Sequence, residues 1–159
     1  MVGLVLVLLV FLMMRSCSIS PPSMSGLGGF EPPGATDGAV VELPGPLRSA
    51  SCRPQGAGTG VERCVIAAGD PLLFGGIMGG RELTFQVQRV QPGQLTQTIQ
   101  QWRSAGGTVV ADGEVFAAIN ASSAVLFADT ASGLRVDTGS FTDRAGAQTF
   151  LARSGLLQQ

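Results

Sequence analysis

Carboxylates in the second half of the chain are the side chains best suited to chemistry. Asp112, Glu114, Asp129 and Asp137 could supply the pair of carboxyl groups that glycoside cleavage uses, one as acid and one as base or nucleophile. Their spacing selects no particular pair, and turns account for Asp112 and Asp129. A carboxylate-dependent hydrolase is therefore one alternative, but no catalytic residue is assigned and we expect a protein that is not an enzyme.

Missing residue types exclude several common kinds of chemistry. The 159 residues include no His and no Lys. A Ser–His–Asp triad, a His-Glu-x-x-His zinc site and a histidine general base are thus excluded, as are a Walker A lysine and a lysine Schiff base. The formal net charge of −1 does not give the excess of positive charge that is typical of nucleic-acid-binding proteins. We expect no cofactor and no nucleic-acid partner.

Three cysteines lie in the first half of the chain, with no Cys-x-x-Cys pattern and no histidine, so we expect no metal site. Cys52 and Cys64 enclose a short glycine-rich loop. In an exported protein a disulfide between them would stabilise a small local core, by about 3 kcal/mol for a loop of this size. Two reduced thiols are the alternative.

The amino-terminal sequence is typical of a membrane or export signal. Residues 1–14 are uninterrupted apolar sequence, which as a helix would span about 21 Å, less than the roughly 30 Å hydrocarbon core. Residues 1–17 therefore predict a signal peptide or a membrane anchor, with a buried core helix as the other alternative. Cys17 after Ser16 resembles a lipidation site, although Arg15 does not fit that pattern and Cys17 could be a free thiol beside an anchor. We expect the protein at the extracytoplasmic face of the cell membrane, or secreted.

Proline, glycine and serine dominate the chain from residue 18 to residue 60. Seven prolines in this range oppose a long helix or a central strand, and few large apolar side chains are present to offset the entropy of ordering. We therefore predict a flexible linker over 18–60, in which only Ala39–Leu43 could form a short edge strand.

Apolar periodicity predicts strands and two helices over 61–159. Leu83, Phe85 and Val87 alternate with polar residues, as in a half-buried strand. Pro92 opens a helix that ends at Gly106-Gly107, and Thr142 stands where the second helix needs an N-cap. The other predicted elements are strands over 61–68, 108–111 and 134–138, and a packed glycine-rich segment over 72–80. A hairpin is predicted within 114–128, with a short helix over 115–120 as the alternative.

These elements predict an α+β fold, in which a small antiparallel sheet carries two helices on one face in a ferredoxin-like arrangement. Both helices are amphipathic and the strands alternate. We therefore expect the other face of the sheet to be left to solvent or to a ligand.

A local pattern near the carboxyl terminus resembles a known family. An alternating strand over 134–138, then Gly139-Ser140-Phe141, then a helix that contains Ala147 and closes at Gly155, looks like one half of a SPOR (sporulation-related repeat) domain. Phe85-Gln-Val-Gln88, followed by a helix and Gly106, resembles the other half. The apolar amino terminus and the proline-rich linker also suit that family.

The resemblance implies that the open sheet face binds cell-wall glycan through Gln86, Gln88, Arg135 and Ser140. The sequence then predicts an exported or membrane-tethered, non-catalytic binding module of the cell envelope, with glycan or an envelope protein as its partner. One alternative is an accessory subunit of a membrane protein complex. A secreted protein of another kind, or the hydrolase considered above, remains as a further alternative.

Overall fold

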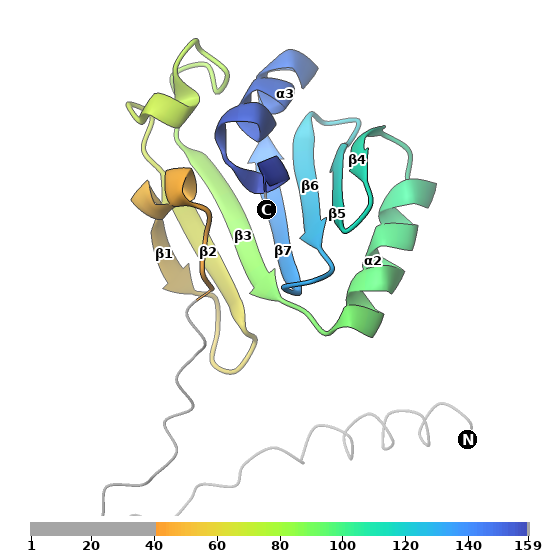
Figure 1. Ribbon diagram of the computed structural model, residues 1–159. Coiled ribbons are helices and arrows are strands. Elements are labelled where there is room, and N and C mark those ends of the chain that lie inside the picture. Colours follow the sequence, from red (N-terminus) through yellow and green to blue (C-terminus); the bar gives the residue numbers. More distant parts are fainter. Residues whose placement is uncertain (1–40, 159) are drawn as a thin grey trace, which may run out of the picture. The chain divides into compact units, whose positions relative to one another are not determined.

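A computed structural model describes residues 41–158, which fall within one compact unit. Seven strands form one sheet in the order β1-β2-β3-β7-β6-β5-β4, and every neighbouring pair is antiparallel (Figure 1). The strands are β1 Ser51–Pro54, β2 Val61–Ile66, β3 Leu83–Arg89, β4 Thr108–Asp112, β5 Val115–Ile119, β6 Ala124–Asp129 and β7 Leu134–Ser140. The helices are α2 Pro92–Ser104 and α3 Arg144–Arg153, with short 3-10 helices η1 Gly45–Ser49, η2 Pro71–Leu73 and η3 Leu156–Gln158. The predicted α+β class is confirmed, but the sheet is larger than the small sheet that the sequence predicted.

The two helices begin where local chemistry supports them. α2 has Pro92 in its first turn, where the missing N–H has no helical partner to lose. Asp143, rather than the predicted Thr142, caps α3: its Oδ1 accepts the backbone N–H of Gly146 at 2.7 Å. Thr142 instead donates its hydroxyl to the carbonyl oxygen of Ile77 at 3.0 Å, and so ties the start of α3 to the glycine-rich segment.

The larger core lies between the sheet and α3. Alternate residues of β3, Leu83, Phe85 and Val87, are buried there, as the sequence predicted. From α3, Phe150 and Leu151 pack into the same cluster. We call this side of the sheet the α3 face. Apolar residues of η1, η2 and the glycine-rich segment complete it, namely Leu47, Leu72, Leu73, Ile77 and Met78.

The smaller core lies on the opposite side of the sheet, under α2. Leu95 and Ile99 of α2 contact Phe116 and Ala118 of β5, whereas Ala117 and Ile119 of the same strand belong to the larger core. Because successive strand residues point to opposite faces, the two helices cover opposite faces. The prediction that both helices share one face was therefore wrong, and the ferredoxin-like arrangement is not confirmed. We call the second side the α2 face.

The predicted linker is shorter than expected at its carboxyl end. Leu47 is fully buried in the larger core, and β1 pairs with β2 along the edge of the sheet. Residues 41–60 therefore belong to the folded unit, because Val41, Leu43 and Leu47 give apolar anchors between the prolines. A strand at Ala39–Leu43 is not formed over 41–43, and residues 39 and 40 lie outside the described part of the chain.

The predicted amino-terminal features lie outside the described residues. These are the apolar segment within residues 1–17, Cys17, and the linker up to residue 40. Among residues 41–158, no helix has the length and apolar character needed to cross a bilayer.

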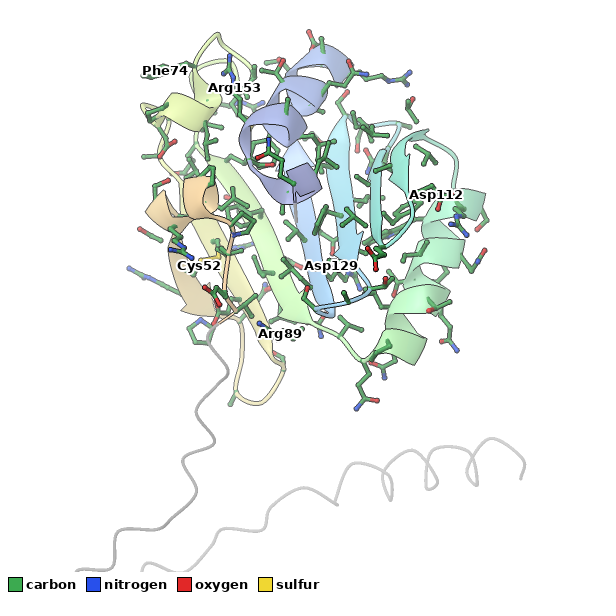
Figure 2. All side chains as sticks on the ribbon, in the orientation of Figure 1. Cys52, Phe74, Arg89, Asp112, Asp129 and Arg153 are labelled. Atoms are coloured by element: carbon green, nitrogen blue, oxygen red, sulfur yellow. A yellow bond between two sulfur atoms is a disulfide. The ribbon has the colours of Figure 1, made fainter. Side chains whose placement is uncertain are left out.

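The segment between β2 and β3 folds back over the carboxyl end of α3. Arg153 donates a hydrogen bond from Nη1 to the carbonyl oxygen of Phe74 at 2.7 Å, so both residues lie at the same end of the molecule (Figure 2). Gly146 of α3 packs so closely on Ile77 that an added Cβ would lie 3.1 Å from the Ile77 carbonyl oxygen. The prediction of a packed, glycine-rich segment over 72–80 is confirmed.

Candidate functional site

Strands β3 and β7 bring three of the predicted binding residues together. In their register Gln88 lies directly opposite Arg135, and Gln86 lies opposite Asp137. Residues that face each other across an antiparallel pair share one face of the sheet. The neighbouring residues Phe85 and Val87 are buried on the α3 face, so these four polar residues lie on the α2 face.

The fourth predicted residue, Ser140, reaches the same face through a bulge. Strand β6 pairs Leu126 with Asp137 but Ala124 with Ser140, so β7 contains one extra residue between these pairs. Ala124 and Leu126 are two residues apart and share a face, which places Ser140 on the α2 face with Asp137. Ser140 is exposed at the end of β7, whereas Arg135 is half-buried near its start. Gln86, Gln88 and Arg135 therefore form the centre of the group, and Ser140 lies at its end.

An ion pair and a tryptophan border this group. The Arg135 Nε donates a hydrogen bond to Oδ2 of Asp137 at 2.7 Å, and both side chains are largely shielded from solvent. The guanidinium carbon of Arg135 lies 5.2 Å from the ring centre of Trp102, within range of a cation–π interaction. Trp102 in turn stacks on Phe116, with 6.1 Å between ring centres. Packing in the smaller core thus fixes the position of Trp102 beside Arg135.

Burial raises the pKa of Asp137 above its ordinary value of 3.8, while the positive charge and hydrogen bond of Arg135 lower it by a smaller amount. Such perturbed groups gather at binding and catalytic sites, although structural ion pairs also produce them. The arrangement of Gln86, Gln88, Arg135 and Asp137 therefore offers both donors and acceptors to a polar ligand.

Two of the other carboxylates considered for catalysis, Asp112 and Asp129, have local partners. Asp112 forms an ion pair with Arg103 of α2. Asp129 accepts the backbone N–H of Ala131 at 2.8 Å in the turn before β7, and Figure 2 shows it well apart from Asp112. Asp112 therefore links the end of β4 to α2, and Asp129 stabilises the turn that follows β6. The role of Asp129 agrees with the expectation that a turn accounts for it.

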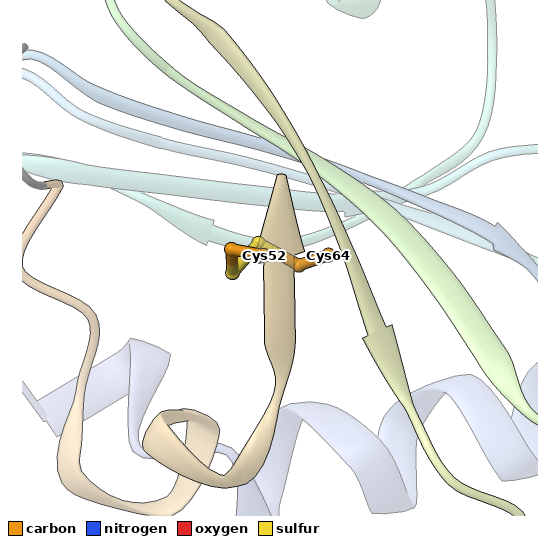
Figure 3. Close-up of a disulfide and its surroundings, with 2 residues drawn as sticks. All are labelled: Cys52 and Cys64. Carbon is orange, nitrogen blue, oxygen red and sulfur yellow. A yellow bond between two sulfur atoms is a disulfide. The ribbon is translucent and has the colours of Figure 1, made fainter. Parts of the chain in front are cut away.

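The disulfide predicted between Cys52 and Cys64 is present and lies on the α3 face (Figure 3). Glu62 lies close enough to both sulfur atoms that the three residues are the only group of potential metal ligands found within residues 41–158. Both sulfur atoms are engaged in the bridge, which leaves one carboxylate as a free ligand. This group does not fit a resident metal ion while the bridge is intact.

Comparisons with known proteins find no match. This holds for protein-family models, for curated proteins and for solved structures. The geometry of the α2 face is therefore the basis for assigning a function.

Sequence reasoning missed several residues of this surface. Both helices were predicted on the face opposite the binding residues, so the contact between Trp102 of α2 and Arg135 was not foreseen. Asp137 was considered only as one of several candidate catalytic carboxylates, although its place two residues after Arg135 in an alternating strand indicates a shared face. Arg53 and Arg63 were also missed, because β1 was taken as linker and Arg63 had no predicted neighbour.

Proposed function

We propose that the protein is a non-catalytic binding module of the cell envelope, exported or tethered to the membrane, whose α2 face recognises cell-wall glycan. One observation carries the proposal: Gln86, Gln88, Arg135 and Ser140 lie on the same face of the sheet, where α2 packs over β5 and β6 and reaches only Arg135, through Trp102. A flat array of amides beside an aromatic side chain suits the hydroxyl and acetamido groups of a saccharide.

Further features support a location outside the cytosol. Disulfides persist in oxidising compartments, and the Cys52–Cys64 bridge closes a hairpin at the edge of the sheet. The apolar sequence of residues 1–14 provides the export or tethering signal. The SPOR resemblance of residues 134–155 supports glycan as the ligand class.

Retention of the full chain on purified peptidoglycan sacculi tests the proposal. The double variant Gln86→Ala, Gln88→Ala removes two amides that lie on the uncovered part of the α2 face, and we expect it to lose most of the retention. Gln94→Ala, Gln97→Ala is the matched control, because it removes two amides that are exposed on α2. Equal retention of both variants, or no retention of the unaltered chain, would refute the proposed function.

A second candidate function is an accessory subunit of a membrane complex. The edge strand β4 exposes Val109 and Val110, and the loop after η2 exposes Phe74. An open strand edge with apolar side chains can pair with a strand of another protein. Migration of the chain on its own, without a partner protein, in native gels of gentle detergent extracts would count against this candidate.

A further inference from the structure

Two arginines face each other at the β1 end of the α2 face. Arg53 of β1 lies directly opposite Arg63 of β2, and both side chains are exposed. Like charges in this position destabilise a strand pair. Within residues 41–158, neither arginine forms an ion pair, since the paired arginines are Arg48, Arg103 and Arg135. The repulsion between the two guanidinium groups is therefore not offset by a carboxylate of the folded unit.

A covalent link holds the two arginines in register. Cys52 and Cys64 form the next pair along the same two strands, and their disulfide lies on the α3 face. Strands β1 and β2 therefore cannot separate at this point to relieve the repulsion. Figure 3 shows the bridge joining the two strands. The disulfide thus keeps two positive charges close together, and within residues 41–158 neither of them is paired with a carboxylate.

The arginine pair borders a hollow and continues the polar row of the proposed glycan site. A shallow hollow of about 420 Å³ is lined by Ser51, Arg53, Pro54, Gln55, Arg63 and Val65. Arg63 lies opposite Gln86, which lies opposite Asp137, so the row runs Arg53, Arg63, Gln86, Asp137 across four neighbouring strands. Neighbouring strands lie about 4.8 Å apart, so the row gives one polar side chain at each such step.

We propose that Arg53 and Arg63 bind carboxylate groups of an acidic saccharide that lies along this row. This inference rests on the proposed function and adds the class of glycan. Guanidinium groups present planar, paired N–H donors that match a carboxylate, and two of them side by side suit an acidic group better than a neutral sugar. The amides of Gln86 and Gln88 then serve the neutral part of the chain.

The test compares two saccharides that differ in their carboxylates. A hyaluronan hexasaccharide alternates N-acetylglucosamine with glucuronate, and chitohexaose contains N-acetylglucosamine alone. Both are titrated into the full chain in a mild detergent. We expect the acidic hexasaccharide to bind more tightly, and Arg53→Gln or Arg63→Gln to weaken its binding by about tenfold each, the typical effect of losing a hydrogen bond to a charged group. Chitohexaose binding should change less than about twofold in both variants.

The control and a second readout separate binding from structure. Arg144→Gln removes the same charge from an exposed position at the start of α3, and we expect it to leave both affinities unchanged. Arg63→Gln should unfold at the same temperature as the unaltered chain or at a higher one, because it removes the repulsion from Arg53. A thermal scan in the absence of saccharide measures this.

Four outcomes overturn the inference. They are equal affinity for the two hexasaccharides, an unchanged affinity of Arg63→Gln for the acidic one, an equal loss in Arg144→Gln, and competition by millimolar inorganic phosphate that abolishes the preference. If sacculi still retain the chain in any of these cases, the proposed function stands and only the ligand class is wrong. If neither saccharide binds and sacculi do not retain the chain, both the inference and the proposed function fail.

Discussion

Removal of the disulfide is the perturbation whose size the structure predicts best. Cys52 and Cys64 are 12 residues apart in the sequence, so the bridge closes a short loop in the unfolded chain. Loop-closure entropy for such a loop corresponds to about 3 kcal/mol of stability. The folded unit of about 120 residues has an unfolding entropy near 250 cal/mol/K, so the melting temperature should fall by about 12 °C.

The choice of cysteine separates the covalent link from packing. Cys52 is exposed, so Cys52→Ala removes the bridge without opening a cavity. Cys64 is fully buried in the larger core, so Cys64→Ala also removes packed atoms and should cost about 1 kcal/mol more. Both variants are made with Cys17→Ala in place, because the cysteine left without its partner, Cys64 in one variant and Cys52 in the other, could otherwise pair with Cys17.

Thermal unfolding followed by circular dichroism measures the effect. The reference is Cys17→Ala alone, which keeps the bridge and should melt like the unaltered chain. Adding a reductant to the reference should reproduce the fall seen in Cys52→Ala. A fall below about 3 °C in Cys52→Ala would mean that the unfolded chain gains little freedom when the loop opens, and the entropic argument would fail.

Three further predictions concern the backbone, the helix cap and the buried carboxyl group. Gly133→Ala should destabilise the fold by more than about 3 kcal/mol, because Gly133 has φ +72° and a Cβ would lie 2.6 Å from the Val90 carbonyl oxygen. Gly58→Ala is the control, with φ +78° but open space around it; similar unfolding free energies in urea for the two variants would contradict the steric argument. Asp143→Ala should cost about 1 kcal/mol in the same assay, and no loss would mean that the bond to Gly146 is not formed. Because burial raises the pKa of Asp137, the unaltered chain should lose stability as pH rises from the ordinary value of 3.8 through the folded-state pKa, and this loss should be smaller in Asp137→Asn; parallel pH curves would refute it.

Periodicity predicted most of the central sheet and both helices. Strand β3 and helix α2 follow from single-faced patterns, in which Leu83, Phe85 and Val87 alternate and Leu95 and Ile99 are a turn apart. The β5–β6 hairpin was preferred over a short helix and is confirmed. These elements could be predicted because each buries one face, and the period of that face identifies the element.

The placement of the helices could not be predicted from the helices themselves, since amphipathicity does not say which sheet face receives them. The deciding signal lies in β5, where Phe116, Ala117, Ala118 and Ile119 are all buried. A strand without alternation is covered on both sides, so this apolar run implied one helix on each face. Strand β1 was missed for a different reason: it is four residues long, contains Pro54 and is exposed throughout, so its sequence carries no burial pattern.

Exposure to solvent explains some of the polar residues on the α2 face but not all of them. Glutamines at alternate positions of β3 are expected of a strand with one face exposed to solvent. Solvation does not account for two arginines placed opposite each other, or for the partial burial of the Asp137 carboxyl group, which raises its pKa. Local features that work against stability are expected where a surface has a function. Here both occur in one row of the sheet, with Gln86 between them, so a ligand with a carboxylate at the arginine end of this row would offset the repulsion between Arg53 and Arg63.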